Sequence, residues 1–210
     1  ATWVGFKQTS VEFDRPERSA GVTKWTVKKM VRLAEDGIIA NSMYPLKIAL
    51  KLQNLLEQSG CSVVLTRSDE NAIYDIDSKT LKQKKISDIK NRVKIGNEAS
   101  ADICVSIHLN KGDSSAYSGW QTFYKKNDEK GKRLATSIQN ELKETIKVEN
   151  KRTAHEISGI YLVDNVEIPI TIVECGFLSN PQEAKKLLTD EYQNELAWGI
   201  YSGILNYFNE

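Results

Sequence analysis

The sequence has few cysteines, and they form no recognisable pattern. Cys61, Cys104 and Cys175 lack the C-x-x-C spacing of metal and redox motifs. Cys104 and Cys175 lie in apolar stretches, where a free cysteine behaves as a small buried hydrophobe. We therefore expect no disulfide framework.

An excess of charge and long apolar runs are also absent. Because 29 basic residues face 28 acidic ones, the composition argues against nucleic acid as a partner. No uncharged apolar run approaches the roughly 20 residues that cross a bilayer, so we expect no transmembrane segment. The N-terminus lacks the residue order of a signal peptide, which indicates either a cytosolic protein or one whose leader has been removed.

Two apolar stretches each carry one polar side chain suited to chemistry. Residues 103–110 predict a buried strand that ends at His108, and residues 170–177 predict a second one that contains Glu174. Ligands of open α/β sheets bind at the C-terminal ends of the strands. We therefore expect His108 and Glu174 to meet at one edge of the sheet and to form the candidate site.

Strands and helices alternate along most of the chain. Periodicity predicts helices over 46–59, 86–96, 134–146 and 190–208, and strands over 62–66, 120–124, 161–163 and 168–175. Residues 23–34 have helical spacing, although 22–27 could as easily form a strand, while 69–85 and 147–158 are typical of irregular segments. Asn180 should cap a helix, with Glu183 returning a bond to the cap. This order predicts an α/β fold, a mostly parallel sheet flanked by helices on both faces, in a single domain over residues 1–210.

Several segments resemble a known enzyme family. Residues 66–69, 106–110 and 173–180 are similar to segments of the zinc-dependent N-acetylmuramoyl-L-alanine amidases of the amidase-3 type. Within that family, residues 87–93, 119–124 and 160–163 most resemble the CwlD-type branch, which trims the spore cortex. The resemblance covers roughly residues 46–208, and residues 1–45 depart from it.

The resemblance implies a reaction and roles for three residues. The family hydrolyses the amide between N-acetylmuramic acid and the first L-alanine of the peptidoglycan stem peptide, using a zinc ion and a glutamate that acts as general base and then acid. By this likeness His108 is a zinc ligand, Glu174 is the catalytic glutamate and Asn110 supports the site. The likeness also implies export to the cell wall or spore cortex, a muropeptide substrate, a role in sporulation or germination, and an activating protein of unknown identity.

The front of the chain departs from the family pattern. The family has a first zinc histidine in a Gly-His-Gly-Gly turn and a glutamate ligand shortly after it, whereas here Asn41 stands near the position of that glutamate. Glu35 and Asp36 could supply oxygen ligands, although exposed acids are usually only solvated. The second histidine, His155, lies in a polar stretch and is interpreted as a surface residue.

Three other interpretations of the sequence stay open. The missing ligands suggest a catalytically silent module that keeps the fold and binds glycan or a protein partner. Cys175, directly after Glu174, suggests a thiol hydrolase, which would need a positioned base beside it. His108 and Glu174 could also be a satisfied polar residue and a salt-bridged acid without a shared function.

Overall fold

The computed structural model describes residues 43–209. Several predictions on the front of the chain lie outside these residues. They are the strand or helix within 22–34 and the ligand candidates Glu35, Asp36 and Asn41.

Four strands form one mixed sheet in the order β1-β4-β2-β3. The strands are β1 (Cys104–Asn110), β2 (Gln121–Lys125), β3 (His155–Ile157) and β4 (Ile170–Phe177). β1 pairs with β4 in parallel and β2 with β3 in parallel, whereas β2 and β4 are antiparallel. The predicted strands at 103–110, 120–124 and 168–175 are confirmed, with ends shifted by one or two residues.

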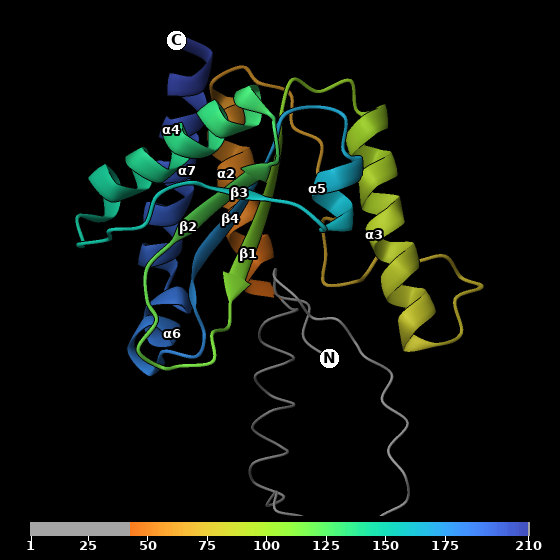
Figure 1. Ribbon diagram of the computed structural model, residues 1–210, viewed down its shortest axis with the longest axis horizontal. Helices are drawn as coiled ribbons and strands as arrows, with labels where there is room; N and C mark the ends of the chain where they lie inside the picture. The colour runs from red at the N-terminus through yellow and green to blue at the C-terminus, as the bar shows by residue number, and fades with distance from the viewer. Residues whose placement is uncertain (1–42, 210) are drawn as a thin grey trace, which may run out of the picture.

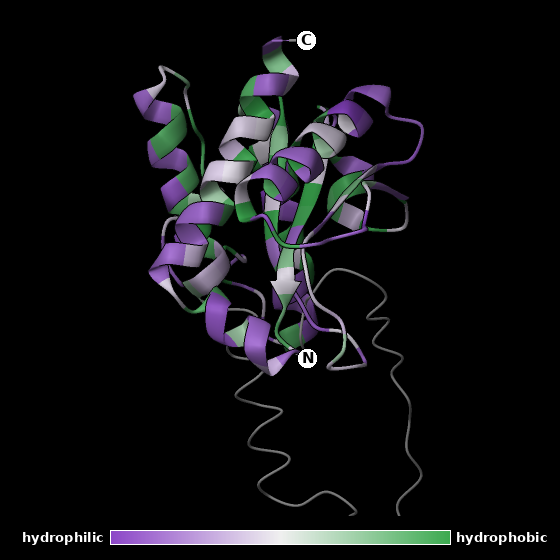
Figure 2. Cartoon of the chain, turned by 90° about the vertical axis from the view of Figure 1, so that its left-hand side faces the viewer, coloured by the Kyte–Doolittle hydropathy of each residue, from purple (hydrophilic) through white to green (hydrophobic). Residues whose placement is uncertain are grey.

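Helices cover both faces of the sheet, as predicted (Figure 1). On one face, α3 (Leu81–Glu98) and α5 (Tyr161–Asn165) share a hydrophobic cluster with Ile170 and Ile172 of β4. On the other face, α2 (Met43–Gln58), α4 (Glu129–Ile146) and α7 (Asp190–Asn209) pack on Val173 and Cys175. A short helix, α6 (Pro181–Leu187), follows β4. Hydrophobic residues gather along the strands and the inner sides of the helices (Figure 2).

Local capping sets where the helices begin. Thr80 caps α3 with a complete capping box, and the Asp128 side chain accepts a hydrogen bond from Gly131 at the start of α4. Asn180 caps α6, with proline at the first turn. The predicted helices over 46–59, 86–96, 134–146 and 190–208 are confirmed, although α3 and α4 each begin five residues before the predicted start. Within residues 43–209 the structure contains no helix that combines the length and the apolar character needed to cross a membrane.

Two predicted strands are wrong. Residues 62–66 form no strand, because none of the described strands pairs with them. Residues 161–163 form the first turn of α5, in which Asp164 N–H bonds the carbonyl of Ile160 and Leu162 and Val163 are buried. A run of three apolar residues fits both the spacing of a helix and that of a buried strand, and packing against α3 favours the helix. The segment 147–158, expected to be irregular, contains β3.

The contact between α4 and α7 depends on glycine. A Cβ on Gly203 would lie 2.5 Å from the Cα of Ile138, and the Ser137 hydroxyl donates to the Gly203 carbonyl at 2.8 Å. Backbone atoms cannot move aside as a flexible side chain can. The two helices can therefore approach this closely only where α7 has no side chain.

We predict that Gly203→Ala lowers the free energy of unfolding by about 2 kcal/mol, because the methyl group must push the two helices apart. Gly96→Ala in α3 is the matched control, since its nearest heavy atom outside α3 would be a Val166 methyl at 3.7 Å. This control should be neutral or should stabilise by up to about 1 kcal/mol through helix propensity. Urea unfolding measures both, and equal stabilities would contradict the close approach of α4 and α7.

Candidate active site

The β-ladder places the two candidate residues side by side. His108 of β1 and Glu174 of β4 are direct partners in the parallel pair, and Gln121 of β2 is the partner of Glu174 on its other side. Directly paired residues project to the same face of a sheet. The three polar side chains therefore form a row across three strands, on the face covered by α3 and α5.

Glu174 is fully buried, and no hydrogen bond from the described residues offsets the cost of burying its carboxyl group. Its exposed fraction is zero, and neither carboxylate oxygen has a hydrogen-bond partner among the residues that the structure describes. Burial disfavours the charged form and raises the pKa of the Glu174 carboxyl to about 8. A buried polar group without a partner is costly, and such groups cluster at functional sites.

His108 is held in a neutral form. Its Nε2 lies 2.7 Å from the hydroxyl of Ser106, two residues earlier on the same face of β1. Burial, followed by the charges of Arg92 and Arg67, lowers the pKa of His108 to about 3. A neutral imidazole is the form that binds metals or accepts a proton.

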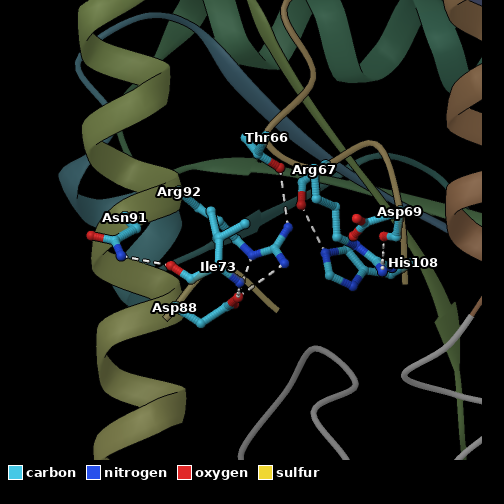
Figure 3. Close-up of polar contacts among 9 residues, drawn as sticks. Thr66, Arg67, Asp69, Ile73, Asp88, Asn91, Arg92 and His108 are labelled. Atoms are coloured by element: carbon cyan, nitrogen blue, oxygen red, sulfur yellow. Dashed lines mark hydrogen bonds and ion pairs between the residues drawn. The ribbon is translucent and has the colours of Figure 1, made fainter. Parts of the chain in front are cut away.

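The two arginines belong to a polar cluster that ties the 66–75 segment to α3 (Figure 3). Arg92 forms an ion pair with Asp88 at 2.7 Å and donates to the Thr66 hydroxyl at 3.1 Å. Asp88 in turn accepts from the backbone N–H of Ile73 at 2.8 Å. Sequence analysis assigned no role to Arg67 or Arg92. Their only signal was that they lie in segments that resemble the amidase family.

The chain after β4 is held by Glu183. Its carboxylate accepts hydrogen bonds from the backbone N–H groups of Phe177 and Gly119, both at 2.6 Å. The predicted hydrogen bond from Glu183 back to Asn180 does not form, because the carboxylate binds these two N–H groups instead. The Asn180 side chain alone caps the helix. Gly176 has a φ of +155°, and a Cβ there would lie 3.0 Å from the Glu183 carboxyl carbon. Glycine is required for this approach.

Asn110, predicted to support the site, ends β1 beside this turn. Its carbonyl accepts from the Leu178 N–H at 2.7 Å, and its side-chain oxygen accepts from the N–H of Lys111 at 2.7 Å. The Asn110 backbone thus links the end of β1 to the chain that leaves β4. The side chain shapes the start of the following loop.

The donors described so far are too few for a catalytic zinc ion, which normally takes three protein ligands. Residues 43–209 contain no cluster of three histidine, cysteine or acidic side chains that could hold a metal. His108 supplies one neutral nitrogen, and Glu174 a carboxylate without a partner. His155 is exposed on β3, at the opposite edge of the sheet from β1.

Cys175 does not have the environment of a nucleophile. It is fully buried in the cluster on the α2, α4 and α7 face, whereas its neighbour Glu174 and also His108 lie on the other face. Burial raises the pKa of the Cys175 thiol far above its ordinary value. A Cys–His pair with His108 is excluded because the sheet separates the two side chains.

Comparison with known proteins gives this arrangement a family context. Residues 30–206 match the family model described as N-acetylmuramoyl-L-alanine amidase. The chain is 38% identical over 177 residues to the germination-specific N-acetylmuramoyl-L-alanine amidase of Bacillus subtilis, covering 84% of this chain and 74% of that protein. A shorter stretch of 59 residues, 28% of the chain, is 51% identical to 18% of the uncharacterized glycosyltransferase YkcC of B. subtilis.

A solved structure shares the fold. The CwlD amidase from Clostridioides difficile, solved in complex with the GerS lipoprotein, is 43% identical with a TM-score of 0.76. The match covers 78% of this chain and 84% of that one.

The raised pKa of Glu174 predicts a pH-dependent stability. The folded protein keeps the proton up to a pKa of about 8, while the unfolded chain releases it near 4.5. The unfolded state therefore binds fewer protons between these values, and the stability contributed at Glu174 falls as pH rises through this window. Glu174→Gln removes the charge, so the free energy of unfolding of the metal-free variant should exceed that of the metal-free wild type by about 4 kcal/mol at pH 8 and by little at pH 4.

The control for this prediction is Glu156→Gln, which changes an exposed glutamate on β3. Chemical unfolding at a series of pH values gives the difference between each variant and the wild type. A difference for Glu174→Gln that stays constant from pH 4 to pH 8 would show that the Glu174 carboxylate is not destabilised by burial.

Proposed function

We propose a reaction for this chain on the premise that it belongs to the amidase-3 family of N-acetylmuramoyl-L-alanine amidases, whose model it matches over residues 30–206. The reaction is hydrolysis of the amide that joins N-acetylmuramic acid to L-alanine in peptidoglycan, during spore germination. The observation that carries the assignment of the site is the fully buried Glu174 carboxylate, without a hydrogen-bond partner in residues 43–209, next to His108 in the ladder.

Glu174 handles the proton of this reaction. As the attacking water forms its bond to the amide carbon, the ionised form of the Glu174 carboxyl group accepts a proton from that water. It then delivers the proton to the amide nitrogen, the carbon–nitrogen bond breaks, and the stem peptide leaves with a free amine. Neither Glu174 oxygen accepts a hydrogen bond within residues 43–209, so no contact there competes with the proton transfer.

His108 is the residue that would hold zinc. Its neutral state and its position beside Glu174 suit a metal ligand. When bound, zinc polarises the amide carbonyl and makes water more acidic. Asn110 supports this arrangement by linking the end of β1 to the chain that leaves β4.

A silent binding module is the weaker alternative. It was suggested by the absent ligand motifs, but the named relatives that span most of this chain are amidases. The two functions differ in one measurable respect, because a binding module needs neither the Glu174 carboxylate nor a metal for its activity.

The likeness to exported cell-wall amidases also supports a location and a partner. We place the activity outside the cytoplasmic membrane, at the cell wall or spore cortex. The CwlD amidase of C. difficile was solved together with the GerS lipoprotein, and we infer that this chain too works with a protein partner.

Metal analysis tests the role of His108. Elemental analysis of the purified chain should find about one zinc per molecule, because a catalytic site holds one ion. His108→Ala should lose the metal, whereas His155→Ala, which changes an exposed histidine on β3, should keep it. Zinc-free wild-type protein, or equal zinc in both variants, would exclude His108 as a zinc ligand.

Hydrolysis of muropeptides tests the role of Glu174. Release of stem peptide, followed by chromatography, should fall by at least about 100-fold in Glu174→Gln, because the variant cannot accept the proton of water. Glu156→Gln should retain wild-type activity, since that glutamate is exposed on β3. Full activity in Glu174→Gln would refute the proposed mechanism, and an inactive wild type that still binds substrate would favour the silent module.

A further inference from the structure

A polar hollow formed in part by the loop after β1 has no assigned role. Its volume is about 350 Å³, and its walls are residues 116–118 of the loop after β1 and residues 149–152 of the segment between α4 and β3. Ligand sites generally begin near this size.

One wall presents an aromatic ring that is fixed from behind. The centroid of the Tyr117 ring lies 5.8 Å from that of Phe177, and Tyr117 Cδ2 would lie only 2.5 Å from a Cβ placed on Gly112. Glycine at position 112 therefore allows the ring to pack against the backbone. Tyr117 is nevertheless 48% exposed and lines the hollow. The ring is a preformed apolar platform on a polar surface.

The other wall presents planar polar groups that are held in place. The Arg152 guanidinium lies 4.7 Å above the Phe177 ring and donates a hydrogen bond to the Ser118 carbonyl. The Asn150 side chain donates to the Trp120 carbonyl at 2.8 Å and accepts from the Arg152 N–H at 3.1 Å. These contacts join the two walls to each other. Binding would not have to order this wall, which reduces its entropic cost.

The hollow is connected to the candidate site through short stretches of chain. Phe177, which contacts both Tyr117 and Arg152, is the ladder partner of Asn110 at the end of β1 and lies three residues after Glu174. Gly119 lies next to the hollow and two residues before Gln121, the partner of Glu174. The Glu183 carboxylate fixes both Phe177 and Gly119. The hollow therefore lies at the same end of the sheet as Glu174.

The charges around the hollow are nearly balanced. Lys151 pairs with Glu149 at 3.2 Å, and the charge of Arg152 faces that of Glu183 behind the wall. A strongly anionic ligand, such as the carboxylate-rich stem peptide, gains little from such a surface. A neutral, hydroxyl-rich ring suits it better, since its C–H face can lie on an aromatic ring and its hydroxyl and amide groups can bond planar polar side chains.

We propose that this hollow binds a sugar ring of the glycan strand, with Tyr117 as the stacking platform. This inference rests on the proposed function, because it assigns the hollow to the glycan side of the same substrate. The sugar bound there positions the neighbouring amide at Glu174. The hollow thereby determines whether an attached glycan improves substrate binding.

The test is a binding titration followed by NMR with the peptide-free disaccharide of N-acetylglucosamine and N-acetylmuramic acid. It uses the Glu174→Gln background, so that binding is measured apart from hydrolysis. Adding Tyr117→Ala should weaken disaccharide binding roughly tenfold, the loss expected for one stacked ring. Tyr117→Phe should retain binding, which separates the ring from its hydroxyl. The matched control is Tyr161→Ala, an exposed tyrosine on α5, which should bind like its parent.

A second readout uses the protein with Glu174 intact. Tyr117→Ala should raise KM for a disaccharide-containing muropeptide about tenfold and leave kcat nearly unchanged, because the ring contributes binding without touching the reacting atoms. Equal disaccharide affinity in Tyr117→Ala and Tyr161→Ala, or no binding at the highest soluble concentration, would overturn the proposal. So would binding of the free stem peptide, in place of the sugar, at Tyr117.

These outcomes separate the glycan site from the proposed reaction. Hydrolysis that is normal in the wild type and unaffected by Tyr117→Ala would refute only the glycan site. Disaccharide binding that depends on Tyr117, in a protein that does not hydrolyse muropeptides, would support the glycan site and refute the proposed reaction.

Discussion

The parallel pairing of β1 with β4 is the constraint on which the rest of the structure depends. Alternating apolar residues hold the register, because Ile107 and Val173 face α2, α4 and α7 while Ile172 faces α3 and α5. A slip of one residue would turn every side chain of β1 to the opposite face. The hydrophobic core therefore fixes His108 beside Glu174, although neither polar side chain contributes to that core.

This arrangement has a thermodynamic cost that the surrounding fold must offset. A buried carboxyl without a partner favours its protonated form, and near neutral pH it lowers the stability of the folded state. Close packing elsewhere, such as that of α4 on α7 at Gly203, compensates for it. Glu183 is the contrasting acid, since its buried carboxylate accepts two backbone N–H groups and fixes the chain on either side of the site.

The fold was predictable wherever a pattern was long or had a local signal. The helical spacing within 46–59 and 190–208 identified α2 and α7, and the Asn180-Pro181 pair marked the start of α6. The failures have a common physical cause. Residues 62–66 have the composition of a strand, but a strand exists only when another strand pairs with it. The apolar run 161–163 is too short to distinguish the helical spacing of hydrophobic residues from the alternation typical of a strand. Burial against α3 favours the helix.

The sequence by itself determined the α/β class, the buried strands and the two polar residues placed in them, because hydrophobic periodicity is a local property. It could not supply the neighbours of those residues. Arg67 and Arg92 influence His108 from a loop and from α3, and Glu183 turned away from its expected local bond to reach Gly119. Only the tertiary structure decided these contacts, since they join segments far apart in the chain whose approach depends on how the whole core packs.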